Sequence, residues 1–158
     1  MFSGMFTVVV LSGRSQQSMS DQLAGENYLA AVCPANQATG ELDPLLSELR
    51  GENAQDLARV IKAAAATRDS IQAAAAALDS ESLVWPVDVN SDVQIVRDGL
   101  FSQAAALQSL SASDSVAQAK QFRWPIDEIG EASQRLRSRL GLSSDTNEGC
   151  DAWLLSDG

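Results

Sequence analysis

Histidine is absent from the sequence. Its absence excludes Ser-His-Asp and Cys-His catalysis, and it excludes metal sites that need an imidazole ligand. The chain also has no glycine-rich phosphate loop, no nucleophile elbow and no Cys-x-x-Cys motif. We therefore expect a protein that is not an enzyme and that carries no metal and no cofactor.

Basic residues are scarce, with 11 Lys and Arg against 21 Asp and Glu, so the formal net charge is -10. This is the wrong sign for a protein that follows a phosphate backbone or an anionic membrane surface. Arg135, Arg137 and Arg139 form the one basic group. They lie near a predicted helix C-terminus, where cations offset the helix dipole, and Glu131 precedes Arg135 by one turn. We expect no nucleic-acid partner.

Aromatic residues are also few, at 5% of the chain, whereas 45% of its residues are hydrophobic and many of these are alanines. Alanine favours helix and lets helix backbones pack closely. The 158 residues are about the size of one domain. We predict a single all-α domain, an antiparallel helical bundle of about four main helices plus one short helix.

The apolar run of residues 6–11 is too short to cross a bilayer as a helix, which needs about 20 apolar residues. It ends in Leu11-Ser12-Gly13, which resembles the lipobox of bacterial lipoproteins. In that family the next residue is the cysteine that receives the lipid. Here the next residue is Arg14, which has no thiol, so the chain as written cannot be lipidated there.

This resemblance implies export, with membrane contact only through an N-terminal anchor. The alternative is an ordinary N-terminal tail or strand, although no second run of β-branched residues is present to pair with a strand. We divide the chain into a signal-like or flexible segment, residues 1–17, and one helical domain, residues 18–158, with its C-terminal tail held against the bundle.

The chain has two cysteines, Cys33 and Cys150, which are too far apart in sequence for metal-ligand spacing. A disulfide between them would close a loop around nearly the whole domain and would stabilise it by about 4 to 5 kcal/mol in the chain-entropy model. It would also hold the acidic tail against the first helix and let Trp153 pack. Such a bond requires a compartment where thiols oxidise, and the alternative is two separate thiols.

The first predicted helix begins at a serine cap, Ser18 or Ser20, and ends at Pro34, because proline ends or kinks a helix. Residues 34–41 then form a loop. The Asp-Pro pair at positions 43 and 44 predicts a short second helix, with the aspartate as N-cap and the proline in the first turn.

The next predicted helix, residues 53–79, has the clearest apolar stripe. Arg68 falls on this stripe, and we expect its stem to lie along apolar neighbours while its head reaches water. A capping box at Ser91 predicts a third helix. A fourth helical stretch runs from Ser113 to Trp124-Pro125 and resumes at Ile126. It ends at Gly141, a typical residue just beyond a helix C-terminus.

Two Trp-Pro-aliphatic-Asp tetrads begin at Trp85 and Trp124. They are candidates for a binding surface, because aromatic residues concentrate interface energy. The alternative, which we favour, is that each tetrad starts a helix, since proline presets the first turn and tryptophan packs beside it.

The sequence Asp88-Val89-Asn90-Ser91-Asp92 has the alternating oxygen spacing of a calcium loop. The remaining positions of an EF-hand loop do not match, because the sixth residue is not glycine and the twelfth is not glutamate. We therefore interpret this stretch as the start of a helix rather than as a metal site.

These observations favour an exported, cell-envelope-associated helical module that binds a protein or another extracytoplasmic ligand. The alternative is a cytoplasmic helical interaction or regulatory protein with reduced cysteines. An enzyme that uses the carboxylates of Asp127, Glu128 and Glu131 is least favoured, because the helix dipole already explains acidic residues at a helix start.

Overall fold

The computed structural model describes residues 17–49, 51 and 53–156, so the lipobox-like residues 11–14 lie outside the described part of the chain. Within the described part every regular element is helical. The helices are α1 (Asp21–Glu48), α2 (Ala54–Leu78), α3 (Val87–Ser111), α4 (Val116–Ala119), α5 (Ile129–Arg139) and α6 (Thr146–Ser156). The predicted all-α bundle is confirmed.

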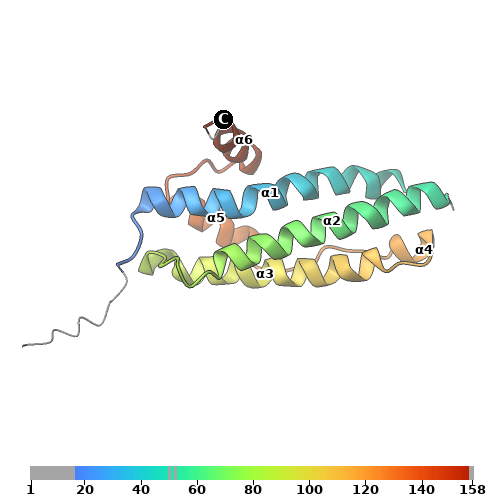
Figure 1. Cartoon of the computed structure of the whole chain (residues 1–158), viewed down its shortest axis with the longest axis horizontal. Helices are drawn as coiled ribbons and strands as arrows, with labels where there is room; N and C mark the ends of the chain where they lie inside the picture. Colours follow the sequence, from blue (N-terminus) through green and yellow to red (C-terminus); the bar gives the residue numbers. More distant parts are fainter. Residues whose placement is uncertain (1–16, 50, 52, 157–158) are drawn as a thin grey trace, which may run out of the picture.

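Three long helices, α1, α2 and α3, lie side by side with alternating directions, and α2 packs against both of the others (Figure 1). Helix α5 packs on α3, and α6 lies against the outer side of α1. Helix α4 is a single turn at the far end of α3, where it contacts α2. The chain thus forms a three-helix layer to which two shorter helices add.

Small side chains let these helices approach closely. Ala64 and Ala75 of α2 are fully buried against the neighbouring long helices. Gly99 of α3 has the same role toward α5, because a Cβ added there would lie 3.0 Å from the Cβ of Ile129. Thr67 adds a polar link, since its hydroxyl donates to the carbonyl of Ala38 in α1 at 3.3 Å.

Helix α1 continues without a break through Pro34 and Pro44, so the predicted helix end at Pro34, the loop that follows it and the separate short helix are wrong. Pro34 is exposed, and its ring faces away from the core. Cys33, Ala35 and Leu42, on other sides of the helix, are buried. Tertiary packing of these sides holds the helix together despite the missing backbone N–H groups.

Helix starts and ends depart from the prediction at other places too. Helix α3 begins at Val87 rather than after Ser91, because the carbonyl of Pro86 already accepts the first intrahelical N–H groups. The break predicted at Trp124-Pro125 in the fourth helical stretch is wider than predicted, because residues 120–128 are not helical between α4 and α5. The acidic tail, whose secondary structure was not predicted, forms α6.

The C-terminus of α5 confirms the prediction for Gly141. This residue has a φ of 68°, in the left-handed region that favours glycine. The N–H of Leu142 donates to the carbonyl of Arg137 at 2.8 Å, and the N–H of Gly141 donates to that of Ser138. This is the Schellman arrangement, which satisfies the last carbonyls of the helix.

Among the helices of the described part, none combines the length and the apolar character that crossing a bilayer requires.

We expect Gly141→Ala to lower the free energy of unfolding by about 1 kcal/mol, because alanine is strained in the left-handed region. Gly40→Ala is the matched control. Gly40 lies inside α1 with nothing near its absent Cβ, so alanine there should stabilise by roughly 0.5 to 1 kcal/mol. Urea unfolding followed by circular dichroism measures both. Equal or reversed effects would contradict the assignment of Gly141 as the helix-ending residue.

Candidate functional site

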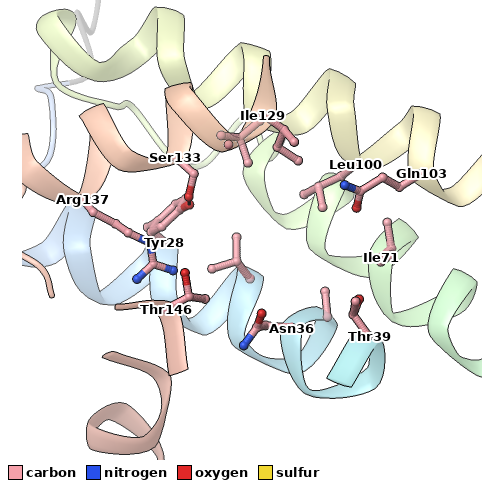
Figure 2. A pocket seen from close by; sticks show the side chains of 14 residues that line it. Tyr28, Asn36, Thr39, Ile71, Leu100, Gln103, Ile129, Ser133, Arg137 and Thr146 are labelled. Carbon is pink, nitrogen blue, oxygen red and sulfur yellow. Dashed lines mark hydrogen bonds between the residues drawn. The ribbon is translucent and has the colours of Figure 1, made fainter. Parts of the chain in front are cut away.

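A cavity of about 240 Å³ lies between α1, α3 and α5, beside the start of α6 (Figure 2). Its lining combines aliphatic side chains with hydroxyl, amide and guanidinium groups. The apolar lining residues are Val32, Ala35, Ile71, Val96, Leu100 and Ile129. The polar lining residues are Tyr28, Asn36, Thr39, Gln103, Ser133, Arg137 and Thr146.

Arg137 is the central polar residue of the cavity. Its side chain is 1% exposed, and of the described residues that line the cavity it alone carries a charge. Its guanidinium carbon lies 5.6 Å from the centroid of the Tyr28 ring, which is a cation–π distance. Its Nη1 donates to the carbonyl of Ser143 at 3.4 Å, which is a long hydrogen bond.

The charge of Arg137 is not balanced by the surrounding protein. Within the described part of the chain, no carboxylate lies within ion-pair distance of its guanidinium. The buried Nε of Arg137 has no hydrogen-bond partner among the described residues. Burying an unpaired charge is costly, so this arrangement is unusual for a residue whose function is only structural.

The helical period of α5 explains why one arginine of three turns inward. Ile129, Ser133 and Arg137 are four residues apart and share the face that lines the cavity. Arg135 and Arg139 project from other faces and are exposed. Arg137 and Arg139 lie in the last turn of α5, in line with the expectation that the arginines are near a helix C-terminus, and Arg137 is buried there. The i, i+4 spacing of Ile129, Ser133 and Arg137 was the sequence signal that could have identified it.

The two exposed arginines link α5 to its neighbours. Arg135 pairs with Asp92 of α3 at 2.8 Å and lies 3.9 Å from Glu131. Arg139 pairs with Asp21 of α1 at 2.8 Å and also with Asp88 of α3. Because solvent screens such exposed pairs, they orient α5 more than they stabilise it.

Two residues of the calcium-like spacing, Asp88 and Asp92, thus lie on α3 as partners of arginines. The described residues contain no group of three or more His, Cys, Asp or Glu side chains placed to hold a metal ion. At the start of α5 the side chains of Asp127, Glu128 and Glu131 are exposed. Asp127 accepts the N–H of Ile129 at 3.1 Å and so satisfies a backbone donor of the first turn.

Tyr28 supports Arg137 from α1. Its ring is 1% exposed, and its hydroxyl forms a hydrogen bond of 2.7 Å with the hydroxyl of Ser133. Burial raises the pKa of Tyr28 above its ordinary value, an effect that the Ser133 hydrogen bond and the positive charge of Arg137 partly offset. Tyr28 is therefore a neutral hydrogen-bonding group at physiological pH.

A disulfide joins Cys33 of α1 to Cys150 of α6, which confirms the predicted pairing. Both cysteines are buried, and the amide of Asn36 donates to the Asn147 side chain at 3.2 Å in the same interface. Gly149 is in close contact with Arg137, because a Cβ there would lie 3.3 Å from its Nη1. The disulfide thus holds the start of α6 against the guanidinium.

The candidate surface tryptophans differ in their environments. Trp85 is 6% exposed and its indole N–H donates to the carbonyl of Leu78 at 3.3 Å, so it belongs to the core and not to an exposed surface. Trp124 is half-buried and packs edge-on against Phe122, with ring centroids 5.0 Å apart. Its indole N–H donates to Asp43 at 3.2 Å.

Arg68 is partly exposed and pairs with Asp69 at 2.8 Å, in line with the expectation that its head reaches the surface.

Comparison of the chain with protein-family models, with curated proteins and with solved structures gives no match. The function is therefore argued from the geometry of the cavity and of the disulfide.

The pKa of Tyr28 gives a pH-dependent prediction. Because the folded state raises this pKa above the value of about 10 in the unfolded chain, the unfolded tyrosine loses its proton first. Stability should be complete below about pH 10 and should fall as the pH rises through the pKa of the folded state. Since Tyr28 is the single tyrosine, the phenolate absorbance reports it directly.

Tyr28→Phe is the control for this titration, because it removes the ionising group and keeps the ring. We expect it to cost about 1 kcal/mol at neutral pH through the lost hydrogen bond and to abolish the tyrosine contribution to the fall in stability above pH 10. A native-state titration midpoint at or below that of the urea-unfolded chain would contradict the burial of Tyr28.

For the disulfide, we expect Cys150→Ser to lower the free energy of unfolding by about 4 to 5 kcal/mol in oxidising buffer, because the cross-link closes a long loop. Cys33→Ser should have the same effect, and the double variant should lose no more than either single variant. Denaturant unfolding with and without reductant measures this. Additive losses in the double variant would mean that each cysteine acts separately.

Proposed function

We propose that the protein is a disulfide-stabilised helical binding module of an oxidising, extracytoplasmic compartment, and that its ligand occupies the cavity at Arg137. The observation that carries this proposal is the disulfide between Cys33 and Cys150. It joins α6 to α1 at the place where the start of α6 completes the cavity wall.

Cysteine chemistry supports the proposed compartment. Disulfides persist in secreted, periplasmic and cell-surface proteins, and they are rare where glutathione and thioredoxin keep thiols reduced. The lipobox-like pattern at residues 11–13 is independent support from the sequence, because it resembles the end of an export signal. Neither of the two cysteines remains for another role once they are paired.

The cavity supports the proposed binding role. A concave site with an apolar wall and a few convergent polar groups is the usual form of a small-molecule site. The titratable side chains in the described lining are Tyr28 and Arg137. Tyrosine with a raised pKa keeps its proton at neutral pH, and arginine stays charged in proteins, so neither supplies a general base. This chemistry supports binding rather than acid–base catalysis.

The test is peptide mapping by mass spectrometry under non-reducing conditions, on protein from its native cells separated into envelope, secreted and cytoplasmic fractions. We expect the cross-linked Cys33 and Cys150 peptides in the envelope or secreted fraction. Thiols are blocked at lysis, so that a bond formed afterwards is not counted.

A chain found in the cytoplasm with both thiols free would contradict this proposal. It would instead favour the cytoplasmic helical interaction protein with reduced cysteines.

A further inference from the structure

We infer that the cavity binds a small organic monocarboxylate with a short apolar body, whose carboxylate pairs with the guanidinium of Arg137. This inference rests on the proposed binding role of the cavity and names the chemical class of its ligand.

The charge of Arg137 favours an anionic ligand. Arg137 brings one positive charge into the cavity, 99% of its surface is covered, and no described carboxylate is within reach. A buried guanidinium that lacks an anionic partner gains more from a bound anion than an exposed one, because water competes little for it. The planar fork of arginine matches a carboxylate, which accepts two of its N–H groups in parallel.

The aliphatic part of the lining favours a ligand with an apolar body. Ile71 and Leu100 present aliphatic carbon to the same cavity on the side away from the guanidinium, where Gln103 and Thr39 also line it (Figure 2). An inorganic anion would leave these aliphatic side chains in contact with water, and a dianion would leave one negative charge without a partner. A monocarboxylate with an aliphatic body pairs its charge with Arg137 and places its apolar surface against the aliphatic side chains, where it is removed from water.

The volume of the cavity limits the size of the ligand. The volume of about 240 Å³ lies below the roughly 300 to 1,000 Å³ of sites for drug-sized ligands. At the share of about 30 Å³ that a water molecule has in the liquid, the cavity holds about eight non-hydrogen atoms. Hexanoate has that number, so it is the probe that best fits the volume.

Tyr28 and Ser133 act as positioning residues in this site. The Tyr28 ring covers one face of the guanidinium, and the hydrogen bond to Ser133 fixes the ring. Gly149 lets the start of α6 approach Nη1, so the disulfide-held segment limits the positions that the guanidinium can take. The guanidinium of Arg137 is therefore held in place before a ligand binds, which lowers the entropy cost of binding.

The experiment is isothermal titration calorimetry on the oxidised full chain in chloride-free buffer. Hexanoate is compared with hexanamide, hexylammonium and acetate. We expect one hexanoate per chain, at least about tenfold weaker binding of hexanamide and acetate, and no binding of hexylammonium. Absence of hexanoate binding, or equal affinity for hexanamide, would overturn the carboxylate assignment.

Variants then identify the residue. Arg137→Met keeps the apolar stem and should weaken hexanoate by at least about tenfold, while Arg135→Gln, which removes the same charge from an exposed face of α5, should change the affinity less than about twofold. Equal losses in both variants would mean that general positive charge holds the anion, which would overturn the assignment to Arg137.

A second pair of variants keeps Arg137 in place, for the case in which Arg137→Met does not fold. Gly130 lines the cavity, and an added Cβ there meets no atom within 4 Å. Gly130→Leu should narrow the cavity and weaken hexanoate more than acetate, whereas Gly40→Leu, at an exposed glycine of α1 outside the cavity lining, should leave both affinities within about twofold. Unchanged hexanoate binding in Gly130→Leu would place the ligand elsewhere and overturn the inference.

The failure of this inference is distinct from the failure of the proposed function. Binding of hexanamide with the affinity of hexanoate would leave a ligand site in the cavity but not a carboxylate site. Free thiols in a cytoplasmic fraction would contradict the proposed compartment whatever the calorimetry shows.

Discussion

The disulfide between Cys33 and Cys150 is the constraint on which the candidate site depends. Helix α6 contributes little to the main core, because only Gly149 and Cys150 of its residues are buried. Without a covalent link, such a terminal helix would be held mainly by a few side-chain contacts with α1. The link places the residues before and within the first turn of α6 beside Arg137, where they complete the cavity. The same bond thus connects the proposed oxidising compartment with the geometry of the candidate site.

The bundle around that link is built from small residues. Alanine on α2 and glycine on α3 let the helices approach closely, so the core is narrow and long. Close packing along α1 also explains why this helix passes through two prolines. Each proline removes one backbone hydrogen bond, but the buried face of α1 is continuous on both sides of Pro34. The packing energy of that face exceeds the local cost of the ring.

The fold class, the cysteine pairing and the end of α5 at Gly141 were predictable, because each depends on a local or compositional signal. Alanine content predicts helix, two distant cysteines have one pairing, and a left-handed residue after a helix requires glycine. The continuity of α1 was not predictable, because local proline chemistry favours a break and only tertiary packing opposes it. Arg137 was missed for a related reason. Three alternating arginines look like a solvated group, and their faces separate only when the partners of α5 are known.

The ion pairs of α5 distinguish Arg137 from the other arginines of this helix. Arg135 and Arg139 of α5 each have a carboxylate from a neighbouring helix, and the chain has 21 acidic residues against 11 basic ones. Acidic side chains are thus abundant, and the described structure still places none of them in the Arg137 cavity. A buried carboxylate there would neutralise the guanidinium permanently and would exclude an external anion. An arginine that is held by an aromatic ring and a carbonyl, and not by an acid, keeps its charge free for a ligand.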